Sequence, residues 1–245
     1  MAKLQVALDF VDLPRAVKCA KAAVAGGARI IEAGTPLIKS EGLNAVRELH
    51  RLFPAVEIIA DMKTVDTGRI EMEAAAKAGA TTATVMGTAS FSTIQECVEA
   101  GRNYGIKVAV DLLGVPDPVE FARKCEEAGV DEVGVHTSID EQMRGGKPFD
   151  LLRRVRKAVT ITVSVAGGIN SETAARAASA GADVVIVGGA INKAKDVAAA
   201  TRTIIKALRT GKSTKTALFR RATDSEALSV LKKVSTPNIS DAMHR

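Results

Sequence analysis

Short apolar runs recur along the chain, and the segments between them have helical periodicity. Residues 12–27 and 171–182, for example, place apolar side chains three or four positions apart, as one face of an α-helix requires. Several such segments end in glycine, which suits the left-handed conformation that often follows a helix. The runs predict eight strands: Leu4–Leu8, Ile30–Ala33, Val56–Ala60, Thr82–Met86, Val108–Leu113, Val133–Val135, Ile161–Val165 and Val184–Val187. The helix-ending glycines are Gly27, Gly79, Gly105, Gly129 and Gly181.

Eight strands that alternate with helices predict parallel pairing through right-handed crossovers. We therefore expect an α/β fold, a single (β/α)8 TIM barrel over residues 1–211, followed by a C-terminal tail over residues 212–245. A doubly wound open sheet is the alternative, but no GxGxxG motif follows the first strand. In such barrels the active site lies at the C-terminal ends of the strands, so polar residues there are the first candidates.

The composition narrows the classes of partner. Aromatic residues make up 3% of the chain, with no Trp and one Tyr, so we expect a core of Val, Ile, Leu and Ala. The net charge of +6 suits nucleic acid or an anionic small substrate. Base-stacking aromatics are nearly absent, however, and much of the basic excess lies in residues 206–233. We expect no nucleic-acid partner.

Three cysteines, Cys19, Cys97 and Cys125, lie far apart in predicted helices without CxxC spacing. Buried free thiols in a reducing cytosol are therefore expected. Lys3 and Asp9 interrupt any apolar start, so no signal peptide is predicted. The apolar runs are also far shorter than the roughly 18 residues of a membrane span. These observations predict a cytoplasmic protein that makes no membrane contact.

Two carboxylates come from neighbouring strand ends. Glu32 lies at the end of the second apolar run and Asp61 directly after the third. They are candidate ligands of Mg²⁺, which takes one or two carboxylates and keeps several waters. Mn²⁺ also prefers oxygen ligands. The alternative is that either carboxylate pairs with Lys63 or with a nearby arginine.

Lys63 follows Asp61 by two residues, so both side chains project to the same side of an extended segment. Its ammonium group is a candidate for stabilising an oxyanion on a substrate. A Schiff base is the rival interpretation, but flanking acids keep an amine protonated and argue against it. An ordinary salt bridge is the remaining alternative.

His136 follows the sixth run and is the histidine best placed to react. His50 lies on a presumed helix and His244 in the tail. General acid–base work is the hypothesis for His136, with a purely structural histidine as the alternative. Asp140 and Gln142 are candidates to orient its ring.

Two glycine pairs follow the last two strands, Gly167–Gly168 and Gly188–Gly189. Glycine allows backbone amides to approach an anion closely, and the loops after strands seven and eight commonly bind phosphate in this fold. Plain tight turns are the alternative. Asp9 and Asp111 are further polar residues at strand ends, after the first and fifth runs.

Several motifs resemble a known family. The stretch ADMKTVDTG, residues 60–68, fits the D-x-K-x-x-D motif of the orotidine 5′-monophosphate decarboxylase suprafamily. Together with EAGTPLIKSEG, VHTSIDEQ, VAGGI and VGGAI, it is similar to the 3-hexulose-6-phosphate synthase branch, over roughly residues 2–211. This resemblance implies an aldehyde-lyase. The reaction would be the metal-dependent aldol condensation of formaldehyde with D-ribulose 5-phosphate to D-arabino-3-hexulose 6-phosphate, and its reverse, through an enediolate.

The resemblance also implies roles for particular residues. The last aspartate of the motif, Asp66, would reach into the active site of a partner subunit in a homodimer, with Arg69 supporting that edge. Glu32 and Asp61 would bind Mg²⁺ or Mn²⁺, and the two glycine pairs would bind the substrate phosphate. The catalytic candidates are Asp9, Asp61, Lys63, Asp66 and His136.

Three classes of function are considered, of which the aldol enzyme is the first and a related decarboxylase the second. A 3-keto-L-gulonate-6-phosphate decarboxylase would carry arginine after the sixth-strand histidine and beside the eighth-strand glycine, where this chain has Thr137, Ser138, Ile139 and Gly189. Orotidine decarboxylase needs neither Glu32 nor His136. A non-enzymatic barrel that uses its basic tail for interaction is the third class.

The tail departs from the barrel pattern. It begins polar and basic, and a helix is expected around residues 224–233. The stretch STPNISDAM, residues 235–243, resembles the start of a regulator-of-ribonuclease-activity A-like domain. The sequence thus predicts the N-terminal part of a longer two-domain protein, with a tail that packs on the dimer or binds a partner as the alternative.

Overall fold

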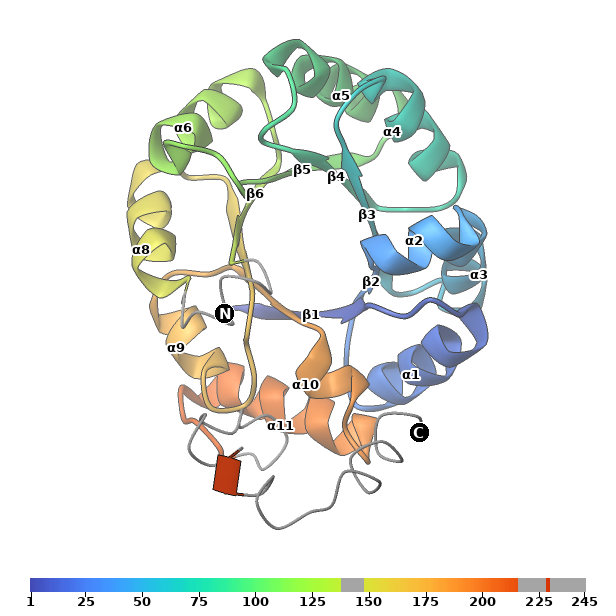
Figure 1. The fold of residues 1–245 in the computed structure, drawn as a ribbon, viewed down its shortest axis with the longest axis vertical. Coiled ribbons are helices and arrows are strands. Elements are labelled where there is room, and N and C mark those ends of the chain that lie inside the picture. Colours follow the sequence, from blue (N-terminus) through green and yellow to red (C-terminus); the bar gives the residue numbers. More distant parts are fainter. Residues whose placement is uncertain (138–147, 216–227, 230–245) are drawn as a thin grey trace.

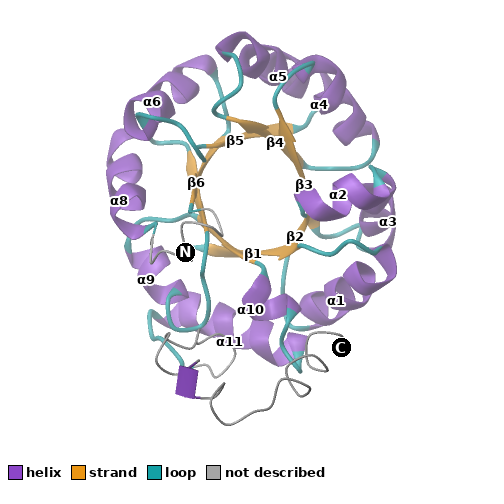
Figure 2. Ribbon diagram, viewed as in Figure 1, coloured by secondary structure: helices purple, strands orange, loops and turns teal. Residues whose placement is uncertain are grey.

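The strands of the protein close into a parallel barrel surrounded by helices (Figures 1 and 2). The structure, a computed structural model, describes residues 1–137, 148–215 and 228–229. Within these ranges the strands pair in sequential order, and β1 pairs with β8 to complete the ring. The predicted (β/α)8 barrel is confirmed. The strands are β1 Lys3–Leu8, β2 Ile30–Ala33, β3 Glu57–Thr64, β4 Thr82–Met86, β5 Lys107–Asp111, β6 Glu132–His136, β7 Thr162–Ala166 and β8 Val184–Val187.

The helices form an outer ring, so each strand is covered on its outer face (Figure 2). Two helices, α2 and α3, connect β2 to β3, and another two, α10 and α11, follow β8. The described helices are α1 Leu13–Ala25, α2 Thr35–Glu41, α3 Asn44–Leu52, α4 Gly68–Lys77, α5 Phe91–Tyr104, α6 Pro118–Ala128, α8 Phe149–Ala158, α9 Ala174–Ser179, α10 Gly189–Asn192 and α11 Val197–Thr210.

The main core lies between the strands and the helices. Outward-facing strand residues such as Val6, Ile58 and Val165 are fully buried there against small aliphatic helix residues. A second, smaller apolar cluster of Ile30, Ile59, Val184 and Ile186 is separate from it. Branched aliphatic residues suit strands that are covered on both faces, which explains how a chain with few aromatics builds this core.

Helix ends follow local sequence signals. The side chains of Asp12, Ser90, Asp117 and Asp196 accept hydrogen bonds from backbone N–H groups in the first turns of α1, α5, α6 and α11. All five glycines predicted at helix ends have positive φ, either at the C-cap or one residue beyond it. One helix begins later than expected. The periodic segment starts at Ser171, but α9 begins at Ala174. The Asn170 side chain accepts from the N–H groups of residues 172 and 173 and holds a turn there.

Two strands end more than one residue away from the apolar runs that predicted them. The β3 strand continues past the apolar run to Thr64, so Asp61 and Lys63 lie within it and not after it. The β5 strand ends at Asp111, two residues earlier than the run, because Asp111 Oδ1 accepts from the Leu113 N–H at 2.9 Å and turns the chain.

Other predictions concern residues elsewhere in the chain. The three cysteines are free and buried. Among the described helices, none is both long and apolar enough to cross a membrane. The expected helix around residues 224–233 and the STPNISDAM stretch lie outside the described residues, apart from residues 228–229, which are helical. Asp140 and Gln142 also lie outside them.

Candidate active site

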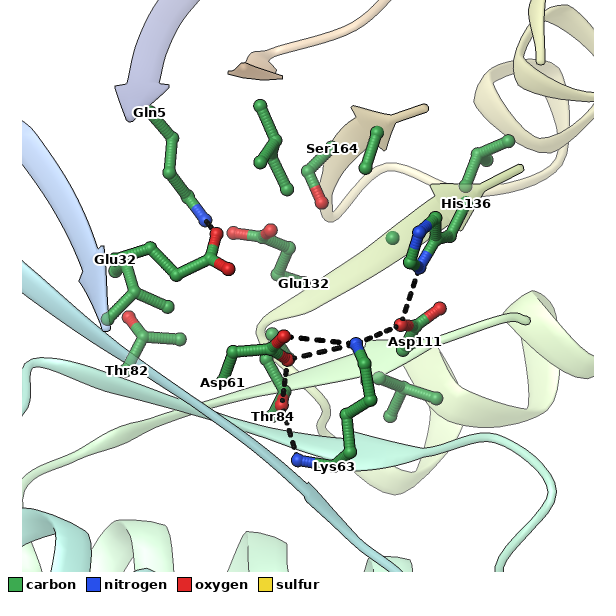
Figure 3. Close-up of a pocket in the computed structure, with 17 residues that line it drawn as sticks. Gln5, Glu32, Asp61, Lys63, Thr82, Thr84, Asp111, Glu132, His136 and Ser164 are labelled. Atoms are coloured by element: carbon green, nitrogen blue, oxygen red, sulfur yellow. Dashed lines mark hydrogen bonds and ion pairs between the residues drawn. The ribbon is translucent and has the colours of Figure 1, made fainter. Parts of the chain in front are cut away.

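A cavity opens inside the barrel and is lined by residues from all eight strands. Polar and ionisable side chains converge on it (Figure 3). They are Gln5, Glu32, Asp61, Lys63, Thr82, Thr84, Asp111, Glu132, His136 and Ser164.

The backbone of β3 is irregular where it presents Asp61 and Lys63. Its register with β4 shifts between Ala60 and Thr64, and Lys63 has a φ of 47°, which is unusual for a residue other than glycine. Such a conformation costs on the order of 1–3 kcal/mol and is typical of functional sites. The Thr84 hydroxyl holds it, because its oxygen accepts from the Lys63 backbone N–H at 3.0 Å.

The Lys63 ammonium group lies between two carboxylates (Figure 3). Its Nζ is 3.1 Å from Asp61 Oδ1 and 2.9 Å from Asp111 Oδ2. Burial alone would lower the pKa of Lys63, but the negative charges of Asp61 and Asp111 raise it above its ordinary value. Lys63 is therefore a cation whose N–H groups can donate to a substrate oxygen, and it is not the neutral amine that a Schiff base requires.

Asp111 connects Lys63 to His136. Its Oδ2 lies 2.9 Å from His136 Nδ1. Burial alone would raise the pKa of Asp111, but the hydrogen bond and charge of His136, followed by those of Lys63, hold that pKa at about 2. An ionised carboxylate only accepts hydrogen bonds, so we assign the ring proton to Nδ1. In the neutral ring, Nε2 is then the basic nitrogen.

No role for Asp111 was predicted from the sequence, although the residue was recognised as polar and at the end of a strand. The missing information is the register, which pairs Asp111 with Gly134, two residues before His136. Thr35 and Thr84 were not predicted as site residues. Threonine is common in and beside strands for structural reasons, so its presence there does not indicate a site. Here both hold Asp61, with the Thr35 hydroxyl 2.7 Å from Oδ2 and the Thr84 hydroxyl 2.8 Å from Oδ1.

Three carboxylates gather on the β1–β3 side of the site. Burial raises the pKa of Glu32 well above its ordinary value, and the charges of Asp61 and Asp9 raise it further. Asp9 is an exposed residue at the barrel mouth, but its carboxyl group lies against the protein. Partial burial of this carboxyl group, followed by the charge of Asp61, raises the pKa of Asp9 too. This accumulation of like charge is an environment that a bound cation would stabilise.

The residues present fit a hard divalent cation. Glu32 and Asp61 come from adjacent strands and both point into the cavity (Figure 3). Across the described ranges, His, Cys, Asp and Glu side chains form no group of three or more that would hold a metal by itself. Mg²⁺ is usually bound by one or two carboxylates, with water and substrate oxygens in the remaining coordination positions, and Glu32 and Asp61 fit this preference.

The predicted phosphate loops lie side by side after the paired strands β7 and β8. Gly167 and Gly168 have φ values of 110° and 67°. A Cβ on Gly188 would lie 2.9 Å from Asp9 Oδ2, so a larger residue there would displace the Asp9 carboxylate. The Asn192 side chain fixes that loop by donating to the backbone oxygen of Ala7 at 2.8 Å.

Neither Asp9 nor Asp66 lines the cavity, but the charge of Asp9 interacts with Asp61 and Lys63, whereas Asp66 stands apart from them. It is exposed in the turn before α4, where its Oδ1 accepts from the Thr67 N–H at 2.8 Å, and it does not line the cavity. Arg69 binds Glu96 and Glu99 on α5, at 3.2 and 2.6 Å, and does not contact the cluster around Lys63 in this arrangement.

Comparison with known proteins identifies close relatives. The sequence matches the Orotidine 5'-phosphate decarboxylase / HUMPS family over residues 2–204. The 3-hexulose-6-phosphate synthase of Methylomonas aminofaciens is 39% identical over 83% of this chain and 98% of its own length. The crystal structure of 3-hexulose-6-phosphate synthase from Salmonella typhimurium has a TM-score of 0.82 and 40% identity, covering 86% of this chain and 100% of that one.

A solved 3-keto-L-gulonate-6-phosphate decarboxylase from Vibrio cholerae is a more distant neighbour. It has a TM-score of 0.72 and 27% identity, and the match covers 84% of this chain and 98% of that one. The chain is thus more similar to these synthases than to this decarboxylase.

Proposed function

The chain belongs to the orotidine 5′-phosphate decarboxylase / HUMPS family, and we propose that its cavity catalyses the aldol addition of formaldehyde to D-ribulose 5-phosphate. The product is D-arabino-3-hexulose 6-phosphate, and the reaction is reversible. The protein is an enzyme, a formaldehyde-fixing aldehyde-lyase. The observation that supports this mechanism most directly is the connected array of Asp61, Lys63, Asp111 and His136.

The first step is removal of a proton from C1 of the ribulose ester. In our proposal His136 Nε2 takes this proton, because Asp111 holds the other ring nitrogen as a donor. The electron pair of the broken C–H bond enters the C1–C2 bond, and the C2 carbonyl oxygen becomes an oxyanion. The intermediate is a cis-enediolate.

The second step forms the new carbon–carbon bond. C1 of the enediolate attacks the carbon of formaldehyde, the C2 carbonyl is restored, and the formaldehyde oxygen receives the proton from the imidazolium. Lys63 keeps its charge throughout, since Asp61 and Asp111 stabilise the ammonium form. Its N–H groups would stabilise the oxyanion, an effect typically worth about 10²- to 10³-fold in rate for one such donor.

Glu32 and Asp61 are the residues that would hold Mg²⁺, or Mn²⁺ in its place. When bound, the cation would supply Lewis acidity that stabilises negative charge developing on the substrate. Thr35 and Thr84 keep Asp61 oriented for this role. The loops at Gly167–Gly168 and Gly188–Gly189 would bind the phosphate, and Asp9 lies against Gly188, in position to bind a sugar hydroxyl.

We also propose a homodimer with shared active sites. Asp66 is exposed, and its neighbours Val65 and Ile70 leave 58% and 65% of their surface accessible, an apolar area that a partner subunit would cover. Co-expression of an Asp66→Ala chain with a His136→Gln chain tests the arrangement, because mixed dimers then contain one intact site. If the mixture is active and neither variant is active alone, the shared-site dimer is supported. An inactive mixture contradicts it.

The reaction is tested by following formaldehyde with ribulose 5-phosphate, before and after chelator treatment and readdition of Mg²⁺. We expect metal-dependent loss of formaldehyde that disappears in Asp61→Ala. The matched control is Asp150→Ala, because the Asp150 side chain is 89% exposed on α8 and pairs with Arg153 on the same helix. Carbon dioxide release from 3-keto-L-gulonate 6-phosphate, without formaldehyde consumption, would move the assignment to the decarboxylase.

A further inference from the structure

Gln5 is a buried amide in an apolar part of the barrel interior. It points inward from β1, is 4% exposed, and pairs in register with Ile30 on one side and Ile186 on the other. These isoleucines belong to the small apolar cluster, where a leucine or methionine would fit chemically. Burying an amide there costs free energy unless the group is hydrogen-bonded, so its presence calls for a specific partner.

That partner is Glu32. Gln5 Nε2 donates to Glu32 Oε2 at 2.6 Å, and both side chains line the cavity (Figure 3). A carboxylate offers two oxygens and about four lone-pair positions, so one amide hydrogen bond fixes its rotation and leaves positions for another ligand. The terminal torsion of a glutamate is otherwise broad and weakly constrained.

The two carboxylates of the site are held in different ways. Asp61 is fixed by Thr35, Thr84 and Lys63. Glu32 instead is held by Gln5, which lies deeper in the barrel, since the residue that pairs with Glu32 is Ala7, two positions further along β1. Gln5 therefore supports Glu32 from below, on the side away from the barrel mouth.

We propose that Gln5 is a positioning residue that orients the Glu32 carboxylate to share a divalent cation with Asp61. This inference rests on the proposed function, which assigns Glu32 and Asp61 as the ligands. Partners that orient metal ligands typically change metal affinity by about 10- to 100-fold when removed. Gln5 touches neither the substrate nor the reacting atoms in this account.

The test is Mn²⁺ binding in the absence of substrate, measured by electron paramagnetic resonance of the free ion. Gln5→Met keeps the length and removes the N–H, and Gln5→Asn keeps an amide but is one methylene shorter. We expect affinity to fall by about 10- to 100-fold in both variants. Activity at low metal should fall in parallel and recover at high metal, with kcat close to that of the unchanged protein.

The matched control is Thr82→Val, a change at another buried, cavity-lining polar residue for which no role in ligand orientation is proposed. It should leave Mn²⁺ affinity unchanged. Thermal unfolding identifies which Gln5 variants are folded, and unchanged Mn²⁺ affinity in a folded one overturns the inference. Glu32→Gln separates the two proposals: loss of binding there with unchanged binding in Gln5→Met rejects only the role of Gln5, whereas unchanged binding in Glu32→Gln rejects the metal site itself.

Discussion

The two faces of the barrel strands differ in almost every property. Outward-facing residues are small or branched aliphatics that are buried against helices, whereas the cavity inside the barrel is lined mainly by polar residues beside the small apolar cluster. The contrast often falls between immediate neighbours in the chain. Such neighbours are Val6 and Gln5, Ile31 and Glu32, Ala60 and Asp61, Val110 and Asp111, Val135 and His136, and Val165 and Ser164.

This difference separates stability from chemistry within single strands. The outer face contributes burial of apolar area, which is the main favourable term in folding. The inner face carries charges that are only partly compensated. Asp111 and Lys63 stabilise one another, whereas burial raises the pKa of Glu32 and Glu132. Substitutions on the outer face should therefore change stability, and those on the inner face should change activity.

The largest expected effect is on the inner face, at His136. His136→Gln removes the proposed base and should lower kcat by about 10²- to 10⁴-fold, the usual range for a positioned acid–base group. The measurement is the steady-state rate of formaldehyde consumption. The matched control is His50→Gln, on α3, which should keep the full rate. A His136→Gln enzyme that retains most of its activity would remove His136 from the mechanism.

On the outer face, Ile58→Ala should lower the free energy of unfolding by about 2–5 kcal/mol, because it leaves a cavity in a fully buried position. Ile58→Val should cost only about 0.5–1.5 kcal/mol. Urea unfolding gives both values. The rate per folded molecule should stay within about twofold. A tenfold loss would require the loss of about 1.4 kcal/mol of transition-state stabilisation, and the outer face makes no contact with the reacting groups. A large fall in kcat would contradict the division between the faces.

Glu132 tests whether the inner face costs stability. It lines the cavity, and burial raises its pKa to about 7 from an ordinary 4.5, although a hydrogen bond from Ser164 opposes the shift. The folded state thus holds this proton more tightly than the unfolded chain, so its contribution is fully present below pH 4.5 and is lost as the pH rises through about 7.

Glu132→Gln, which cannot ionise, should therefore stabilise the protein by up to about 3 kcal/mol at pH 8 and by less than about 1 kcal/mol at pH 5. Chemical denaturation at the two pH values measures the difference. An equal effect at both would mean that the carboxyl group does not titrate in this range. Asp150→Asn, at an exposed position, controls for a general effect of charge removal.

The smallest effect is expected at Thr84. Its hydroxyl accepts from the Lys63 backbone and donates to Asp61, so it fixes both residues at once. Thr84→Val keeps the shape and removes both bonds, and should lower kcat by about tenfold, as expected for the loss of one or two hydrogen bonds. Thr84→Ser keeps the hydroxyl and should remain close to the original rate. Equal rates for the two variants would deny the hydroxyl this role.

The fold could be predicted from the sequence because the apolar runs report the outer face. Val133–Val135 and Val184–Val187 marked two strands within two residues of their observed bounds. The same runs missed the continuation of β3 through Lys63, since that part of the strand is mainly polar and its backbone is irregular. Apolar periodicity cannot report the part of a strand whose polar residues face a site.

The site was only partly predictable for a related reason. Glu32, Asp61, Lys63 and His136 could be predicted to lie together because strand ends converge in a barrel, and all four line the cavity. The contacts from Asp111 to His136 and from Gln5 to Glu32 depend on the register between two strands. Local sequence patterns do not reveal this register. Asp66 was expected at a partner's site, and its exposure leaves that role a prediction.

In the proposed mechanism, His136 and Lys63 form an enediolate from ribulose 5-phosphate before any formaldehyde is bound. The most direct measurement is incorporation of solvent deuterium at C1 of ribulose 5-phosphate, followed by proton magnetic resonance in the presence of Mg²⁺ and without formaldehyde. We predict exchange of one C1 hydrogen by the unaltered enzyme and none by His136→Gln. Formaldehyde consumption by an enzyme that never exchanges this hydrogen would contradict the account.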